Sequence, residues 1–245
     1  MSGPVPATPF QHMSGLRAVV YHWIALADPD TAAFLHDANQ PKPFVISPIH
    51  HERGAELSFT LAITADWLTE LFLRGVRLGG PHIELGRRPF RLLEMPEVVR
   101  EIDWHQLQSG GEHAYRWRLR LLTPTAHHAA GALRKAVPLP SPENYFGTWL
   151  SRWSLLTDQP ANLALRQLVE DRVIVSDCSG ATKRVELGKE RVFVGFVGDV
   201  TFEIRRPGEV PYAHRQALNA AVRLSEFCGT GVETLSGMGQ TMLLE

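Results

Sequence analysis

The chain has 245 residues, of which 44% are hydrophobic and 21% charged, and its net charge is −1, as expected for an ordinary globular protein. No apolar run approaches the ~20 residues that span a bilayer, and the first residues, MSGPVPATPFQHM, lack the basic flank and apolar centre of a secretory signal. We therefore expect a cytoplasmic protein without a membrane segment, and the near-zero charge argues against broad, non-specific binding of nucleic acid.

The first half of the chain predicts the element order α, β, β, α, β. Residues 14–27 carry apolar side chains at helical spacing. Asp28 followed by Pro29 is typical of a helix N-terminus, so a second helix should run to about Asp37. A third helix should begin at Asp66 and end at Gly75. The expected strands lie within 44–49, 55–63, 82–86 and 90–98.

The second half predicts the order β, α, β, β, α, β, which is that of a ferredoxin-like domain. Residues 114–122 alternate between polar and apolar, as in a half-buried strand, and 123–140 is expected to be a loop. Further strands are expected within 171–178, 190–205 and 240–245, with a turn and a short strand in 179–189. Helices are expected over 142–156, near 164–170, and over 212–227.

These orders predict an α+β fold of two tandem ferredoxin-like (RRM-like, βαββαβ) domains, spanning 1–110 and 111–245. The first domain lacks its opening strand in this scheme. The only segment before the first helix, GPVPATPF, contains three prolines, which cannot donate to a β-ladder.

Neither the cysteines nor the histidines predict a metal site. Cys178 and Cys228 have no CxxC partner. The adjacent histidines at 50–51 and 127–128 would point to opposite faces of a strand, and no HExxH motif is present. We expect no metal and no cofactor.

A glycine-rich segment lies close to the C-terminus and holds Gly229, Gly231, Gly237 and Gly239. It does not match a P-loop, because five residues separate Gly231 from Gly237 and no lysine follows. It does not match a dinucleotide fingerprint either, since Thr234 replaces the third glycine and the segment follows a helix. A helix C-cap explains Gly229 alone. We therefore expect a loop whose bare backbone approaches a polyanion.

Basic residues are placed unevenly along the chain. Arg116, Arg118 and Arg120 would share one face of a strand. Further basic residues are Arg87, Arg88, Arg91, Lys183, Arg184, Arg205 and Arg206. Each group alone is most simply solvated surface, and together they are compatible with a short, specific RNA site.

The segment HRQALNAAVRLSEFCGTGVETLSGMGQ resembles the C-terminal signature of the CRISPR repeat-processing endoribonucleases of the RAMP superfamily. The segments GFVGDVTFEI, TPTAHH…PLPSPENYFGTWLSRW and LHDANQPKPFVISPI extend the resemblance over about residues 14–245. The resemblance implies two ferredoxin-like domains and cleavage of CRISPR precursor RNA repeats without metal. In that reaction the 2′-hydroxyl attacks its own phosphate and leaves a 2′,3′-cyclic phosphate and a 5′-hydroxyl. It also implies partners among CRISPR effector-complex subunits and a homodimer.

The resemblance places the catalytic histidine at His36. One branch of the family carries Tyr, His and Lys in this region, and Tyr21, His36 and Lys42 match that order. His36 closes a predicted helix, where the macrodipole favours imidazolium. Lys42 would stabilise charge on the phosphorane, and Tyr21 would bond the phosphate or position the ribose. The structural alternatives are that His36 only caps the helix, that Tyr21 belongs to the core and that Lys42 is a solvated loop charge. His12 and His22 are the alternative catalysts.

The expected RNA-binding residues are those of the glycine segment and two strand arginines: Gly229, Gly231, Thr234, Ser236, Gly237, Gly239, Arg116 and Arg118. Two other functions remain open at this point. One is a non-catalytic RAMP subunit that binds RNA in an effector complex, and the other is a ferredoxin-like protein that binds a small anion.

Overall fold

The structure is a computed structural model, and it describes residue 10 and residues 12–38, 41–52, 56–85, 88–109, 114–128, 136–157, 163–187 and 191–244. The chain forms two compact units. The first consists of Met1–Arg100, Glu186–Val192 and Leu235–Gly237, and the second consists of Glu101–Val185, Phe193–Thr234 and Met238–Glu245. No helix in the described part of the chain is both long and apolar enough to span a bilayer.

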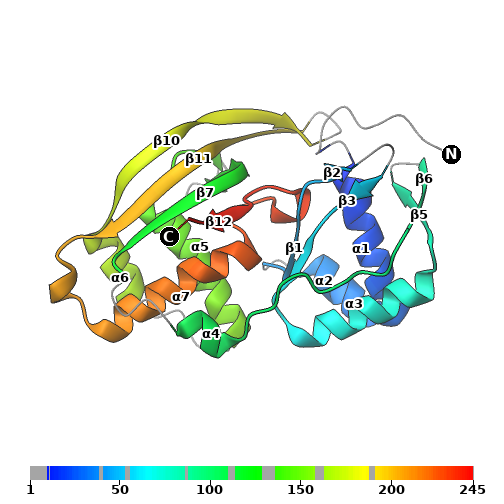
Figure 1. Cartoon of the computed structure of the whole chain (residues 1–245), viewed down its shortest axis with the longest axis horizontal. Coiled ribbons are helices and arrows are strands. Elements are labelled where there is room, and N and C mark those ends of the chain that lie inside the picture. Colours follow the sequence, from blue (N-terminus) through cyan, green and yellow to red (C-terminus); the bar gives the residue numbers. More distant parts are fainter. Residues whose placement is uncertain are drawn as a thin grey trace. The chain divides into compact units, whose positions relative to one another are not determined.

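The first unit packs three helices beside short antiparallel strand pairs (Figure 1). The helices are α1 (Met13–Ala27), α2 (Pro29–Asp37) and α3 (Asp66–Gly79). The pairs are β1 (Phe44–Ile46) with β4 (Leu61–Ile63), β2 (His50–His51) with β3 (Leu57–Ser58), and β5 (His82–Leu85) with β6 (Arg88–Arg91). The core of this unit is centred on α1, whose Leu16, Val20 and Trp23 are almost fully buried.

Helix α2 begins where the sequence predicts. The Asp28 carboxylate accepts hydrogen bonds from the backbone N–H groups of Asp30 (3.1 Å) and Thr31 (3.2 Å), and Pro29 occupies the first turn. These contacts fix the first turn of a nine-residue helix, and His36 lies in its last turn.

Helix α3 does not end at Gly75, so that prediction is wrong. The helix continues to Gly79 and is followed by Gly80, which has a left-handed φ of 68°. Gly75 is buried against α1, and a Cβ at this position would lie 1.7 Å from the Trp23 carbonyl oxygen. Glycine is present because two helix backbones approach closely here.

The second unit contains a four-stranded sheet in the order β10-β11-β7-β12, with helices on one face (Figure 1). The strands are β7 (Arg116–Thr125), β10 (Val173–Glu186), β11 (Val192–Ile204) and β12 (Thr241–Leu243). The helices are α4 (Trp104–Gln108), α5 (Pro142–Thr157), α6 (Leu163–Arg172) and α7 (Tyr212–Cys228). The short elements are β8 (His127–His128), β9 (Ala136–Val137), η1 (Pro207–Glu209) and η2 (Thr234–Ser236). The βαββαβ order expected for this half is confirmed.

Strand β7 lies between β11 and β12, and its alternate side chains point to opposite faces of the sheet. Trp117, Leu119 and Leu121 are buried under the helices, and the alternate residues are exposed. The Trp117 indole N–H donates to Asn219 Oδ1 of α7 at 3.0 Å, which satisfies a buried polar pair.

Several boundaries differ from the sequence predictions. Strand β10 is continuous through 179–186, where a turn and a short strand were expected. The strand expected over 90–98 ends at Arg91, and α4 follows with a capping box between Asp103 and Gln106. Strand β7 extends into the expected loop to Thr125, and the β8–β9 hairpin follows it. The prediction that the first domain lacks its opening strand concerns residues 3–10, of which all but Phe10 lie outside the described residues.

Candidate functional site

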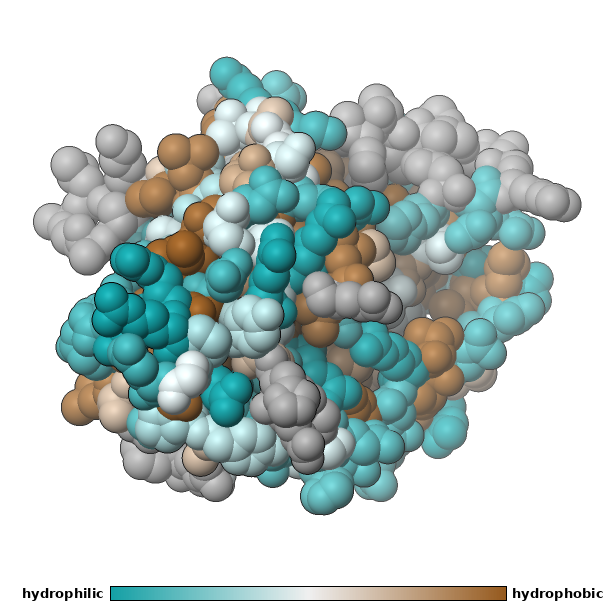
Figure 2. Space-filling model, turned by 60° about the vertical axis from the view of Figure 1, so that its left-hand side comes forward, coloured by the Kyte–Doolittle hydropathy of each residue, from teal (hydrophilic) through white to brown (hydrophobic). Residues whose placement is uncertain are grey.

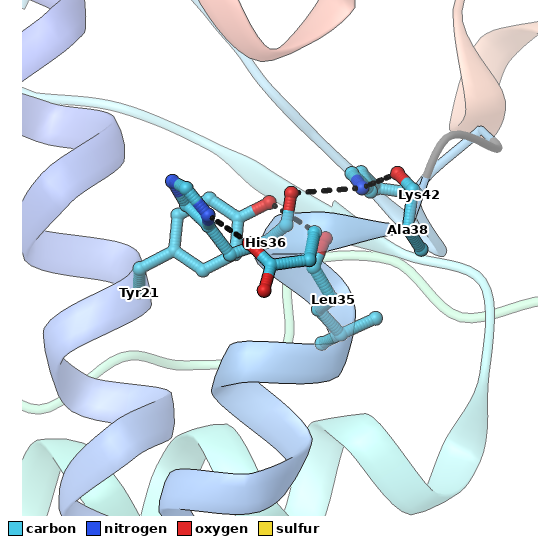
Figure 3. A network of polar contacts seen from close by, with 6 residues as sticks. Tyr21, Leu35, His36, Ala38 and Lys42 are labelled. Carbon is cyan, nitrogen blue, oxygen red and sulfur yellow. Dashed lines mark hydrogen bonds and ion pairs between the residues drawn. The ribbon is translucent and has the colours of Figure 1, made fainter.

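Tyr21, His36 and Lys42 meet at the C-terminal end of α2 (Figure 3). Tyr21 comes from α1, and its ring packs edge-on against the His36 imidazole with 5.5 Å between ring centroids. The Tyr21 hydroxyl donates to the Leu35 carbonyl oxygen at 3.3 Å. The three residues, of which Tyr21 and Lys42 are 21 positions apart along the chain, are thus brought to one helix end.

The His36 imidazole is oriented by the residue that follows it. Its Nδ1 lies 2.8 Å from Asp37 Oδ1, and the two side chains are 72% and 81% exposed. An ionised carboxylate can only accept a hydrogen bond, so Nδ1 carries the proton of this contact. The Nε2 atom is then the position available for proton exchange with a substrate. Asp37 was not among the predicted site residues, and its position directly after His36 was the signal available in the sequence.

Lys42 interacts with the end of the same helix. Its Nζ donates to the carbonyl oxygens of His36 (3.4 Å) and Ala38. Partial burial lowers the pKa of Lys42, and the nearby Asp37 carboxylate opposes that shift. The lysine therefore holds the carbonyl end of α2, where helix partial charge is negative.

Tyr21 is a neutral hydrogen-bond donor at this site. Burial raises the pKa of its phenol, and Arg17 partly offsets the effect. Tyr21 contacts the imidazole and also donates a hydrogen bond to the last turn of α2. It therefore restricts the orientation of the His36 side chain.

The alternative histidines have different surroundings. His12 is 8% exposed, and burial together with Arg88 lowers the pKa of its imidazole. His22 is exposed on α1. Among the contacts of the described residues, neither histidine is joined to His36 or Asp37. In the same part of the chain, no group of three or more His, Cys, Asp or Glu residues is arranged to hold a metal ion.

The glycine segment is a folded loop in which every glycine adopts a left-handed φ. These φ values are 68° for Gly229, 80° for Gly231, 80° for Gly237 and 69° for Gly239. A Cβ at Gly231 would lie 2.2 Å from the Ala126 carbonyl oxygen, and one at Gly239 would lie 2.0 Å from that of Thr230. The protein's own backbone therefore accounts for glycine at these positions.

Buried hydroxyl groups hold the loop in place. The Trp149 indole N–H donates to Thr230 Oγ1 at 3.0 Å, and that hydroxyl lies 2.6 Å from Thr241 Oγ1. The Arg152 guanidinium is 8% exposed and donates to Thr234 Oγ1 at 3.2 Å. Trp149, Thr230 and Arg152 were not predicted from the sequence, because nothing in their spacing marks them as partners of the loop.

The predicted RNA-binding residues of the loop are largely covered by protein. Thr234 and Ser236 are 6% and 9% exposed. The Gly229 N–H donates to the Ser225 carbonyl oxygen in the last turn of α7. The Gly239 N–H donates to the Pro124 carbonyl oxygen. Leu235–Gly237 belong to the first unit, where a Cβ at Gly237 would lie 3.2 Å from Pro48 N.

The strand arginines lie on the exposed face of β7 and are paired with acidic residues of β11. Arg118 and Arg120 contact the Asp199 carboxylate at 2.8 and 2.7 Å, and Arg116 lies 3.9 Å from Glu203. Hydrogen bonds from Arg120 and Arg118 lower the pKa of Asp199 to about 2. The exposed face of β7 therefore carries positive charge that Asp199 and Glu203 partly neutralise. The three arginine side chains are about half exposed.

Comparison with known proteins identifies the family. The family model described as "CRISPR-associated endoribonuclease Cas6" matches residues 119–241. A sequence comparison with curated proteins gives no match. The solved "Cas6 (TTHB231) product complex" is 26% identical, covers 100% of this chain and 96% of its own, and superposes with a TM-score of 0.85. The structure "Thermus thermophilus Cas6 (TTHB231)" is 25% identical, with coverages of 99% and 94% and a TM-score of 0.70.

More distant structures share the fold. The "Cas6 (TTHA0078) product complex" is 21% identical, covers 96% of this chain and 94% of its own, and has a TM-score of 0.78. These matches confirm the expected α+β fold of the tandem ferredoxin-like type. Because the family model matches half of the residues of this chain, the chain belongs to the CRISPR-associated endoribonuclease Cas6 family.

Proposed function

We propose that this endoribonuclease cleaves CRISPR precursor RNA within its repeats by attack of a ribose 2′-hydroxyl on the adjacent phosphate, without a metal ion. The products are a 2′,3′-cyclic phosphate and a 5′-hydroxyl. The observation that carries the proposal is the meeting of Tyr21, His36 and Lys42 at one exposed helix end (Figure 3).

His36 exchanges protons with the RNA in this proposal. The Asp37 carboxylate holds Nδ1–H, so a neutral imidazole presents the Nε2 lone pair and an imidazolium presents Nε2–H. The first form accepts the 2′-hydroxyl proton, and the second donates a proton to the leaving 5′-oxygen. The 72% exposure of the side chain leaves room for an RNA backbone to reach it.

Lys42 and Tyr21 act on charge and position. The phosphorane gathers negative charge on its equatorial oxygens, which an ammonium group stabilises. The contacts of Lys42 Nζ with the His36 and Ala38 carbonyl oxygens keep this ammonium at the same helix end as His36. The Tyr21 ring supports His36, and its hydroxyl is a donor within the same group.

The glycine loop and the exposed arginines of β7 are proposed to bind the RNA. The proposed residues are Gly229, Gly231, Thr234, Ser236, Gly237, Gly239, Arg116 and Arg118. The proposal for the loop is supported by its fixed backbone conformation. The proposal for the arginines is supported by their position on one exposed face of β7. With few base contacts and mainly phosphate contacts, affinity should fall as salt rises. Effector-complex subunits are proposed as later partners of the bound product.

The test is cleavage of a labelled repeat RNA in EDTA, beside the same RNA lacking the 2′-hydroxyl at the scissile nucleotide. We expect a cut in the first RNA and none in the second.

His36→Ala should slow cleavage by ~10²–10⁴-fold while RNA binding persists. His22→Ala is the matched control, since His22 is exposed on α1 beside Tyr21 and should keep full activity. Cleavage of the 2′-deoxy RNA, or activity retained by His36→Ala, would reject the proposal. RNA binding without any cut would favour a non-catalytic member.

A further inference from the structure

Arg17 of α1 differs from an ordinary surface cation. Hydrophilic and hydrophobic residues are interspersed over the face shown in Figure 2, as is usual for a protein surface. Arg17, in contrast, is partly buried, and no described residue forms a hydrogen bond or an ion pair with its guanidinium. Other partly buried arginines are engaged by the protein, since Arg166 donates to Ser151 Oγ and Arg223 donates to three backbone carbonyl oxygens. A partly buried cation without such partners is a candidate for binding an anion.

Arg17 lies one helical turn before Tyr21, on the same face of α1. Four residues along an α-helix correspond to about 6 Å. The chain reverses at Asp28, and Tyr21 contacts the last turn of α2. Because α1 has 15 residues and α2 has nine, α1 continues past the C-terminal end of α2. Arg17 therefore flanks the space beyond this helix end, where His36 and Lys42 lie (Figure 3).

The electrostatics of Tyr21 agree with this placement. The positive charge of Arg17 opposes the rise in the Tyr21 pKa that burial causes. Tyr21 in turn packs against the His36 imidazole. Lys42 Nζ already donates to backbone carbonyl oxygens at the end of α2, whereas the Arg17 donors are not used by any described residue. The site thus has a second cation, on its α1 side, whose donors remain for a ligand.

A phosphate of the RNA is the ligand that suits an arginine in this position. The planar guanidinium donates two parallel hydrogen bonds to phosphate oxygens, and it stays charged at every pH at which a protein is folded. Neighbouring phosphates of an extended RNA strand are separated by a distance similar to one turn of an α-helix. A strand whose scissile phosphate lies at His36 therefore brings an adjacent phosphate within reach of Arg17.

We propose that Arg17 is a substrate-positioning residue that binds the RNA phosphate next to the scissile one. The inference rests on the proposed cleavage reaction and adds to it a contact outside the Tyr21, His36 and Lys42 group. A strand held at this phosphate as well as at the cut has less freedom in the ribose between them, which favours the attack geometry of the 2′-hydroxyl.

Substitutions of Arg17 test the protein side of this contact. Arg17→Met keeps the apolar stem and removes the charge, and Arg17→Lys keeps the charge. Arg17→Met should lower the second-order rate constant of single-turnover cleavage about ten- to hundredfold, and Arg17→Lys should retain part of the activity. The slope of log affinity against log salt should become shallower by about 0.7 in Arg17→Met. Arg77→Met is the matched control, because Arg77 is exposed on α3 and should leave both quantities unchanged.

Changes to the RNA test the other side of the contact. A methylphosphonate at the linkage on either side of the cut removes one charge, and the control RNA has ordinary phosphates and the same 2′-deoxy sugars at these linkages. At one linkage the methylphosphonate should slow the wild type about ten- to hundredfold and slow Arg17→Met little further, since that variant has already lost the contact. Thermal melts check the fold, and Arg17→Lys takes the place of Arg17→Met if the latter is unfolded.

The outcomes separate this inference from the cleavage reaction on which it rests. Effects of the protein and RNA changes that multiply at both linkages, or an Arg17→Met variant as active as the wild type, would overturn the role of Arg17 and leave the reaction intact. A wild type that does not cut the control RNA would reject the proposed reaction and this role together.

Discussion

Two glycines inside helices should respond in opposite directions to replacement by alanine. A Cβ at Gly75 of α3 would lie 1.7 Å from the Trp23 carbonyl oxygen and 2.5 Å from its carbonyl carbon. Ordinary contacts of carbon begin at ~3.5 Å, so α1 and α3 must separate by roughly 1.5 Å or more. At Gly147 of α5 the nearest heavy atom is the flexible Arg166 Nη1, at 3.7 Å.

Overpacking of this kind costs ~1–3 kcal/mol, and more when backbone must move, while alanine gains ~1 kcal/mol in helix propensity. We therefore expect Gly75→Ala to lower the free energy of unfolding by ~2 kcal/mol or more. For a chain of this length that is a decrease of about 4–8 °C in Tm. Gly147→Ala has the propensity gain without the clash and should raise stability by ~0.5–1 kcal/mol.

The assay is guanidinium and thermal unfolding followed by tryptophan fluorescence and circular dichroism, with wild type and both variants in parallel. Trp23 lies at the Gly75 contact and should report the first unit. Tyr21 is carried on the same helix, so Gly75→Ala should also slow RNA cleavage. A Gly75→Ala variant as stable as wild type would show that the backbones of α1 and α3 do not touch.

Three further changes test the candidate site and the second unit. Asp37→Ala should slow cleavage about tenfold with unchanged RNA affinity, because His36 loses its orienting carboxylate; Asp30→Ala, at the other end of α2, is the control in single-turnover kinetics. Burial lowers the pKa of His127 from 6.5 to about 4, so the unfolded chain takes up this proton first. Stability should therefore fall by ~3 kcal/mol between about pH 6.5 and pH 4, and His127→Phe should flatten that limb of the unfolding profile. Gly239→Ala places a Cβ 2.0 Å from the Thr230 carbonyl at a φ of 69°, and it should lower Tm and weaken RNA binding in filter assays.

Local signals predicted much of the fold. The Asp28–Pro29 pair marks the start of α2, and its cap hydrogen bonds are present. The nine-residue alternation of 114–122 predicted β7 and the face that carries its arginines. Gly75 was misassigned because a glycine that ends a helix and a glycine that admits a neighbouring helix are identical in sequence.

The site was predictable only in part, for a related reason. The Tyr21, His36 and Lys42 group followed from a family resemblance, and the structure brings the three together. The contacts of Arg152 and Trp149 with the loop depend on tertiary packing that spacing does not encode, whereas the Asp37 contact joins sequence neighbours and was overlooked. The glycine pattern suggested a ligand, whereas its left-handed φ values and close approaches are internal requirements of the loop.

If the glycine loop binds RNA as proposed, its fixed and buried backbone has a consequence for the kinetics of recognition. Its turns are fixed by four left-handed glycines and by the Thr230 and Thr241 hydroxyls before any RNA arrives. The conformational entropy of ordering this segment is therefore lost during folding rather than during association. Encounter with RNA should then be a single fast step whose rate is limited by diffusion and screened by salt, and differences between repeat sequences should appear mainly in how long the complex lasts.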